Sequence, residues 1–394
     1  MSIGGRRELV REVALRYGRA GKVEKGLILN ELTATTGYDR KYAMRLLGNP
    51  PGPERVKRTR KRRRRYGDSE SRALSRLWPI SGHLGSRRLV EALGPLMEAL
   101  ERHGEWVPEE SVRNKLLQMS SSTCERMLRS IRPRQRIKGL CLTRPGTLKK
   151  QISIRRGTDW DDDRPGFMEA DLVGHSGSSC EGEFFHTLTM TDVATGWTES
   201  AALRSKGQAE TLVNIRSIRG RLPFAMLGID SDNGGEFINH HLFNFCREHG
   251  IVFTRSRPYA KNDACRVEQK NWAVVRRHTG YARLNTDEQF KTLRELHGIL
   301  RLLVNFFEPS AKLLRKERHA QGTRKIHDRP QTPYGRVLDS PHVGDETKQC
   351  LAELYESLNP AALRRRLNLL KKAFWDDALV SILDEATIDS GCDS

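Results

Sequence analysis

The feature that most constrains the fold is the segment LGIDSDNGGEF, residues 227–237, in which an apolar stretch runs directly into a carboxylate and two glycines. The apolar residues Leu227 and Ile229 are typical of a short buried strand. Gly234 and Gly235 predict a sharp turn, so Asp232 is expected at the exposed end of that strand. A carboxylate in this position is suited to binding a divalent metal ion.

Two further carboxylates complete a candidate site. GFMEADLVGH is an apolar run around Asp171, and the following FFHTLTMTDVATGW predicts a hairpin partner. Thirty-five residues lie between Asp232 and Glu268, whose segment 265–277 has good helix formers and no Gly or Pro. Holding two Mg²⁺ ions at a phosphodiester requires several carboxylate oxygens in one place. We therefore predict that Asp171, Asp232 and Glu268 form a catalytic, metal-binding triad.

Four segments in this order, ADLVGH, FHTLTMTDVATGWTE, IDSDNGGEF and YAKND..RVEQKN, resemble the catalytic core of DDE transposases and integrases. The resemblance covers residues 165–280 and is greatest to bacterial insertion-sequence transposases. It implies a ribonuclease H-like, retroviral-integrase-like α/β core, with a mixed five-stranded sheet flanked by helices. The Asp232 to Glu268 spacing equals that of the family, whereas the 60 residues between Asp171 and Asp232 exceed the spacing of retroviral integrases.

The resemblance also implies chemistry, cofactors and contacts. It implies that two Mg²⁺ (or Mn²⁺) ions per active site serve phosphoryl transfer, with no covalent enzyme intermediate. Five residues around Glu268 resemble the contacts that the family makes with DNA ends: Lys261, Asn262, Lys270, Asn271 and Arg276.

Several other polar residues compete for a role in the site. Asp230 lies on the same face of an extended strand as Asp232, but the catalytic Asp of the family directly precedes Asn-Gly, so Asp230 is expected to play a supporting part. Glu169 alternates with Asp171 in the same way, and its role stays open. Asp192 is expected to cap its own turn, and His175 to be a loop residue rather than a proton carrier. The acidic residues within 159–163 are expected to form a solvated loop.

Charge indicates a polyanionic partner. The formal net charge is +20, and +12 remains outside the strongly basic run 54–65, so the excess is distributed along the chain. DNA is the simplest such partner. An anionic membrane surface is the alternative, but no long amphipathic basic helix supports it.

The cysteines and the hydropathy of the chain indicate which classes of protein it does not resemble. The seven cysteines are scattered without a CxxC pair, which predicts neither a zinc site nor a disulfide framework. The N-terminal residues do not resemble a signal peptide, and no apolar run approaches membrane-spanning length. We expect a cytoplasmic, nucleoid-associated protein.

The chain is long enough for several domains. Residues 1–50 predict a helix-turn-helix DNA-binding domain whose last helix, with Asp39 as its cap, presents Arg40, Lys41 and Arg45. Residues 51–67 predict a basic linker that contacts DNA. Its expected contact residues are Arg58, Arg60, Lys61, Arg62, Arg63, Arg64 and Arg65.

Residues 68–136 predict a second helical, helix-turn-helix DNA-binding domain, with Arg126 and Arg129 facing DNA. A capping box at Ser122 and Glu125 is expected to open its last helix. A connector (137–164) leads to the catalytic core (165–285). In the core we expect strands at 167–173, 184–193, 197–203, 225–231 and 251–255, and helices at 207–219 and 238–249.

Residues 286–394 predict a helical and basic C-terminal region. Apolar residues at helical spacing from Phe290 to Phe307 indicate an amphipathic helix. The basic segment 312–329 is expected to be loop-like, and residues 345–380 to form two helices that contact DNA or a second protomer.

Together these features predict a transposase that binds the terminal inverted repeats of an insertion sequence, cleaves at its ends and joins the 3′-OH ends to target DNA. Bringing two ends together requires at least a homodimer. Two other functions stay open: a catalytically silent DNA-binding regulator, and a ribonuclease H-like nuclease without strand transfer.

Overall fold

The chain divides into two units, Met1–Arg65 and Tyr66–Ser394. The computed structural model describes residues 1–52, 65–132, 153–154, 163–177, 179, 181–232, 234–255, 270–319 and 322–389. Among the helices within these ranges, none combines the length and the apolar character needed to cross a membrane.

The first unit is a small helical bundle of α1 (Ile3–Arg19), α2 (Lys22–Thr36) and α3 (Arg40–Gly48). Val10, Ile28 and Leu47 are among the residues of its apolar core. Gly37 ends α2 with φ +70°, a conformation that glycine adopts without strain. The predicted cap of α3 is confirmed, because the Asp39 carboxylate accepts hydrogen bonds from the first backbone N–H groups of that helix.

The second unit begins with α4 (Asp68–Ile80), α5 (Ser86–Arg102), α6 (Glu110–Leu117) and α7 (Ser121–Leu128). The predicted cap of α7 is wrong by two residues. The Ser120 hydroxyl accepts the hydrogen bond from Thr123 N, and Glu125 pairs with Arg132 instead of reaching back to a cap. The serines at 120–122 offer equivalent local caps, so the packing of the helix decides which one is used.

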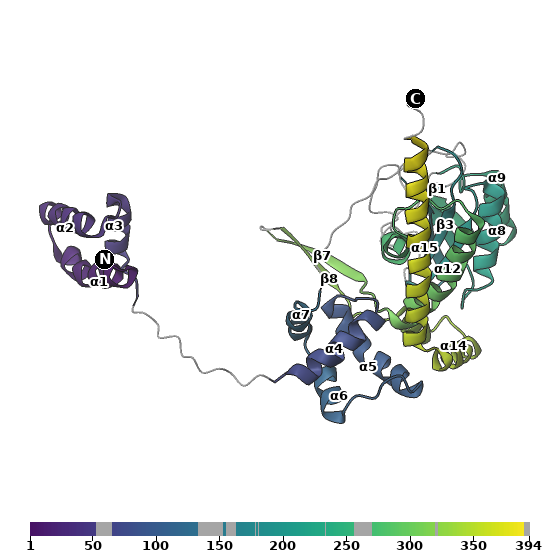
Figure 1. Ribbon diagram of the computed structural model, residues 1–394, viewed down its shortest axis with the longest axis horizontal. Helices are drawn as coiled ribbons and strands as arrows, with labels where there is room; N and C mark the ends of the chain where they lie inside the picture. The colour runs from purple at the N-terminus through teal and green to yellow at the C-terminus, as the bar shows by residue number, and fades with distance from the viewer. Residues whose placement is uncertain are drawn as a thin grey trace. The chain divides into compact units, whose positions relative to one another are not determined.

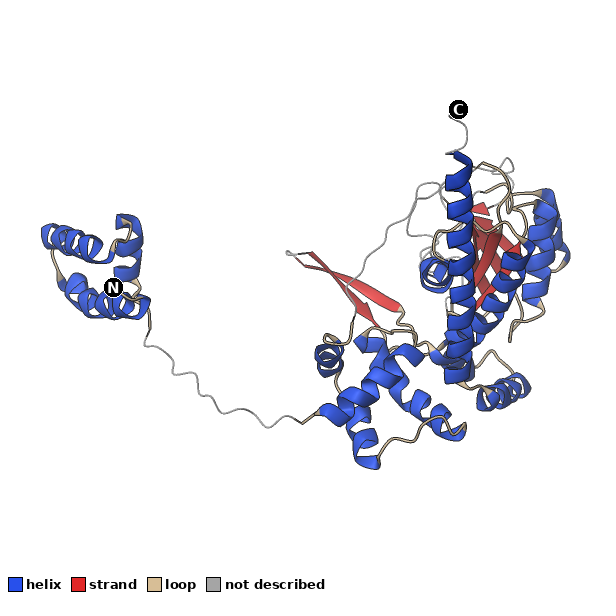
Figure 2. Ribbon diagram, in the orientation of Figure 1, coloured by secondary structure: helices blue, strands red, loops and turns tan. Residues whose placement is uncertain are grey.

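The predicted strands form a mixed sheet from β2 (Phe167–Gly174), β3 (His186–Asp192), β4 (Thr198–Leu203), β5 (Gly228–Ser231) and β6 (Val252–Arg255). β2, β3 and β4 are antiparallel neighbours, whereas β5 is parallel to both β2 and β6. This order and the flanking helices give the ribonuclease H-like α/β fold that the sequence predicts (Figure 2). A two-residue strand, β1 (Ser153–Ile154), adds a sixth strand beside β6, within the predicted connector.

Side chains alternate between the two faces of the sheet, and those on one face pack against helices. Met168 and Ala170 of β2 share an apolar core with α8 (Gln208–Arg219) and α9 (His240–Glu248). Glu169 and Asp171 alternate with these two residues and therefore lie on the opposite face, where the candidate site is built. After residue 269 the chain continues as the π-helix η1 (Asn271–Arg276), where an α-helix is expected, and α11 (Arg277–Thr279).

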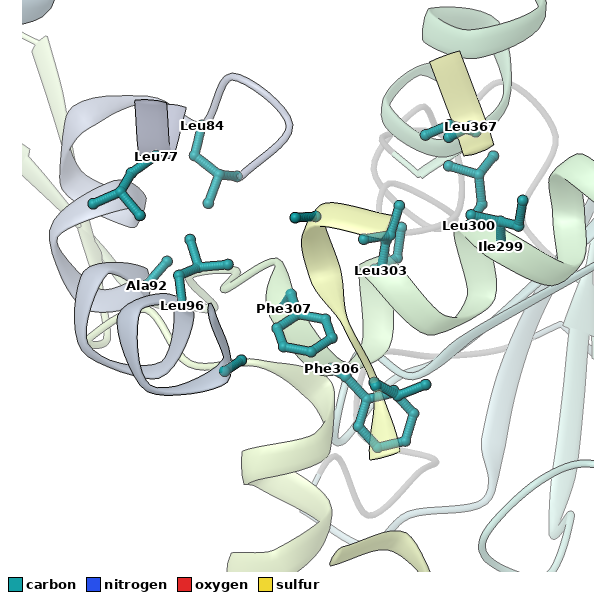
Figure 3. Close-up of a cluster of buried hydrophobic side chains, with 14 of the residues drawn as sticks. Leu77, Leu84, Ala92, Leu96, Ile299, Leu300, Leu303, Phe306, Phe307 and Leu367 are labelled. Carbon is teal, nitrogen blue, oxygen red and sulfur yellow. The ribbon is translucent and has the colours of Figure 1, made fainter. Parts of the chain in front are cut away.

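The predicted amphipathic helix is confirmed as α12 (Asp287–Phe307), which opens with a capping box of Thr286 and Gln289. The two predicted helices further on are α14 (Asp345–Ser357) and α15 (Pro360–Asp389), and a short α13 (Pro333–Asp339) precedes them. Helices α4 and α5 share one apolar core with α12 and α15, to which Leu77, Leu96, Leu303 and Phe307 all belong (Figure 3). The domain boundaries predicted inside this unit stay predictions.

The loop predicted for 312–329 is wrong, because β7 (Leu313–His319) and β8 (Gly322–His327) form an antiparallel hairpin there (Figure 1). Consecutive charged residues occupy the middle of each strand, so no alternation of apolar and polar residues marks the strands in the sequence. Pairing with the partner strand stabilises this conformation, and that pairing is not visible in either segment alone.

Candidate active site

Two of the three predicted carboxylates come from neighbouring parallel strands. The last residue pair between β2 and β5 is Ala170 with Ser231. Asp171 and Asp232 each follow this pair by one residue, so both carboxylates come from the same end of two neighbouring parallel strands. β5 ends at Ser231, so Asp232 begins the turn that its glycines predict, and both carboxylates are half-buried.

The carboxylate of Asp171 is held by hydrogen bonds from its own strand and from η1. Its Oδ1 accepts a hydrogen bond from the backbone N–H of Leu172 at 2.8 Å. Its Oδ2 accepts one from Nδ2 of Asn271 at 2.6 Å, across 100 residues of sequence. Asn271 is the first residue of η1, and π-helical turns are frequent at functional sites. The Asn271 amide therefore fixes the orientation of Asp171.

Asp232 is held by its own turn. Its Oδ1 accepts a hydrogen bond from the backbone N–H of Gly234 at 2.9 Å. Burial raises the pKa of Asp232, and this hydrogen bond opposes the effect. The carboxylate is thus desolvated but retains a donor that favours its charged form.

Glu236 is a carboxylate of this region that the sequence analysis missed. Burial, and then the charge of Asp232, raise the pKa of Glu236. The Glu236 carboxylate lies close against this turn, because a Cβ on Gly234 would lie 2.6 Å from its Cδ. The signal in the sequence is the acid that follows the Asn-Gly-Gly turn.

The competing residues have other partners. Asp230 is buried, and its Oδ1 accepts a hydrogen bond from the Thr254 hydroxyl at 2.6 Å. Glu169, also buried, is the register partner of Asp230 on β2. Asp192 caps its turn as predicted, since its carboxylate accepts hydrogen bonds from Gly166 N and from both N and Oγ1 of Thr195.

His175 lies inside the protein rather than in a loop exposed to substrate. It is fully buried, and its Nε2 lies 2.8 Å from Oγ1 of Thr187. Burial lowers the pKa of His175 well below its ordinary value, so the ring is neutral.

Of the predicted DNA-contacting residues in η1 and just before it, Asn271 is buried, and Lys270 and Arg276 are partly buried. Asn271 bonds to Asp171, and Nη2 of Arg276 donates to the carbonyl oxygen of Gly174 at 2.7 Å. Burial lowers the pKa of Lys270 to about 8. These two hydrogen bonds join η1 to β2, and the predicted contacts with DNA stay predictions.

The other predicted DNA-contacting residues are exposed or lie outside the described ranges. The exposed ones are Arg40, Lys41, Arg45, Arg65, Arg126 and Arg129. Those outside the described ranges are Arg58, Arg60, Lys61, Arg62, Arg63, Arg64, Lys261 and Asn262, and Glu268 of the triad lies outside them as well.

The side chains present suit a hard divalent cation. Aspartate oxygens are ligands that Mg²⁺ prefers. Oδ1 of Asn271 is buried beside Asp171 and accepts no hydrogen bond from the described residues. A cation at Asp171 and Asp232 would also offset the desolvation of Asp232. Within the described ranges no three His, Cys, Asp or Glu side chains gather as metal ligands, and Glu268 lies outside these ranges.

The chain resembles solved structures and a protein of known sequence. No family model matches it. It resembles the catalytic core domain of BIV integrase at 19% identity and a TM-score of 0.31, over 45% of this chain and 96% of that one. It resembles the HTLV-2 integrase catalytic core, solved in complex with magnesium, at 14% identity and a TM-score of 0.28, over 37% and 90%.

A full-length relative is the uncharacterized protein y4rM of Sinorhizobium fredii (strain NBRC 101917 / NGR234). The two are 38% identical over 339 residues, which make up 85% of this chain and 96% of that protein. The chain therefore belongs to the same family as y4rM.

Proposed function

We propose that this protein is a DNA transposase of an insertion sequence. It binds the terminal inverted repeats, cleaves at the ends and joins the freed 3′-OH groups to target DNA. The observation that carries the proposal is the position of Asp171 and Asp232 at neighbouring strands of a ribonuclease H-like sheet, followed by Glu268 after 35 residues. Carboxylates in this arrangement are suited to metal-dependent phosphoryl transfer.

The chain's own residues divide the work of the proposed reaction. Asp171, Asp232 and Glu268 hold the divalent ions, and Asn271 keeps Asp171 in one orientation. When bound there, two Mg²⁺ ions activate the attacking oxygen and stabilise the leaving oxygen of the phosphodiester. The enzyme itself forms no covalent bond to DNA.

The proposed partners are the terminal repeats and target DNA. The net charge of +20 supports binding to phosphates, and the exposed Arg40, Lys41 and Arg45 on α3 supply one candidate contact surface. Two ends must be held together before joining, so the active form in this proposal is a homodimer or a larger homo-oligomer bound to DNA in the nucleoid.

A joining assay tests the proposal. The purified protein is incubated with Mg²⁺ or Mn²⁺, labelled DNA that ends in the element's terminal repeat, and a target plasmid. We expect joined products with the wild type and none with Asp171→Asn, Asp232→Asn or Glu268→Gln. End binding should persist in these variants, because most of the affinity comes from phosphate contacts elsewhere.

Asp345→Asn is the matched control, since Asp345 is an exposed carboxylate at the start of α14. This variant should join DNA as the wild type does. Joining by Asp232→Asn would refute the assignment of the triad. Specific binding without metal-dependent chemistry would identify a regulator, and cleavage without joining would identify a nuclease.

A further inference from the structure

Strands β7 (Leu313–His319) and β8 (Gly322–His327) form a two-stranded ribbon that extends away from the sheet and helices of its unit (Figures 1 and 2). The two strands contain five Lys or Arg residues and a single carboxylate, Glu317. The register places Lys316 directly opposite Lys325. Like charges opposite one another destabilise a strand pair, so the stability of the ribbon does not explain this arrangement.

Most of the ribbon side chains that the structure describes are exposed, and Glu317, Ile326 and His327 are partly buried. Arg315, Arg324 and Lys325 are exposed, and Leu314 is 64% exposed. Glu317 is engaged by Arg315 at 2.9 Å. An isolated two-stranded hairpin is marginally stable in water, so a ribbon with this composition gains from a partner that neutralises its charge.

The base of the ribbon, in contrast, is fixed to the rest of the unit. The Asp328 carboxylate accepts a hydrogen bond from Lys312 N and forms an ion pair with Arg336 at 2.8 Å. Arg87 of α5 donates to the carbonyl oxygen of Asp328 at 3.0 Å, and Arg329 pairs with Glu91 of the same helix. Asp328, the carboxylate next to the ribbon, is thus paired with residues at the base of the ribbon and does not neutralise its strands. The ribbon itself projects from this fixed base.

We propose that the β7–β8 ribbon binds duplex DNA by entering a groove and contacting the phosphates on either side. The major groove accepts a two-stranded ribbon, and the unbalanced lysines and arginines match the charge of the phosphates. The proposal rests on the proposed function only for the identity of the polyanion as DNA, and it requires no chemistry at the active site.

The test measures DNA affinity in the full-length protein without metal. Fluorescence anisotropy gives the Kd for a labelled duplex in EDTA over a series of salt concentrations. We expect the double variant Lys316→Gln/Lys325→Gln to weaken binding roughly tenfold and to lower the log–log salt slope by about two, because each lost phosphate contact removes about 0.9 from the slope. Thermal unfolding should be unchanged, since Lys325 is exposed and both substitutions remove like charges.

The matched control is Lys291→Gln/Arg294→Gln, which removes the same charge from exposed positions on α12. Its salt slope should stay near that of the wild type. Equal slopes in all three proteins would overturn the proposal. So would an unchanged slope together with a lower oligomer mass in sedimentation, which would assign the ribbon to contacts between copies of the chain.

The joining assay separates this proposal from the proposed function. A wild type that joins no DNA, with a reduced slope in the ribbon variant, would refute the transposase and leave the ribbon as a DNA-binding element. Normal joining by the wild type together with equal salt slopes would support the transposase and refute the ribbon as a DNA-binding element.

Discussion

Asp171 and Asn271 show how one side chain prepares another for metal binding. The Asn271 amide donates to Oδ2 of Asp171 at 2.6 Å, and this leaves Oδ1 with the backbone N–H of Leu172. A carboxylate fixed in this way loses little further freedom when a cation binds. Groups that orient metal ligands commonly change metal affinity by about 10- to 100-fold.

Asn271→Ala should therefore raise the Mg²⁺ concentration that gives half-maximal joining about tenfold, because Asp171 is no longer oriented. A Mg²⁺ titration of the joining rate measures this. Saturating Mg²⁺ should restore part of the rate, which a loss of folding would not allow.

The control is Asn214→Ala, since the Asn214 amide donates to the carbonyl oxygen of Glu210 within its own helix, α8. Its Mg²⁺ titration should match that of the wild type. An unchanged Mg²⁺ requirement in Asn271→Ala would show that Asn271 does not position the metal ligand.

At the scale of elements, a buried polar contact joins β2, β3 and α12. Oγ1 of Thr187 on β3 lies 2.8 Å from Nε2 of His175, just after β2, and 3.3 Å from Nε2 of His297 on α12. Burial lowers the pKa of His297 to about 3 and also lowers the pKa of His175 well below its ordinary value. Both rings are neutral in the folded protein, and both can be protonated when the chain unfolds.

This arrangement predicts acid sensitivity. The pKa of His297 is lower in the folded than in the unfolded chain, so the unfolded chain binds more protons below about pH 6.5. The free energy of unfolding should fall as the pH decreases from about 6.5 towards 3, by up to ~1.4 kcal/mol per pH unit for each buried histidine. Urea unfolding at a series of pH values measures it.

His297→Gln should reduce that pH dependence by the contribution of one proton, whatever its effect on stability at neutral pH. His241→Gln is the control, because His241 lies exposed on α9. The same slope in His297→Gln and in the wild type would contradict the assignment.

At the scale of the whole molecule, the chain has one small unit and one large unit with separate apolar cores. The core of the second unit includes side chains from α4, α5, α12 and α15 (Figure 3). A deletion inside that unit would expose apolar surface, whereas removal of Met1–Arg65 leaves its core complete.

Residues 66–394 alone should therefore unfold at the temperature of the second unit in the full chain. Their affinity for the terminal repeat should fall about a hundredfold towards the non-specific level, because the predicted reading helix α3 is gone. Calorimetry and anisotropy with specific and unrelated duplexes test both. Equal preference for the terminal repeat in the two proteins would place specificity in the second unit.

The sequence by itself determined the features that local patterns encode. Turn glycines and apolar runs placed Asp232 after β5 and Asp171 on β2, and the helical spacing of apolar residues predicted α12. Such patterns depend on the period of a strand or helix and on the backbone conformation of a turn. Residues close together in the sequence determine both.

The tertiary structure decided which distant residues meet. Only the packing of η1 on β2 brings Asn271 to Asp171, and only the turn after β5 brings Glu236 towards Asp232. The charged β7–β8 ribbon shows no alternation in sequence and depends on pairing between its strands. These contacts depend on how distant segments pack in the folded chain, and a local sequence pattern does not predict that packing.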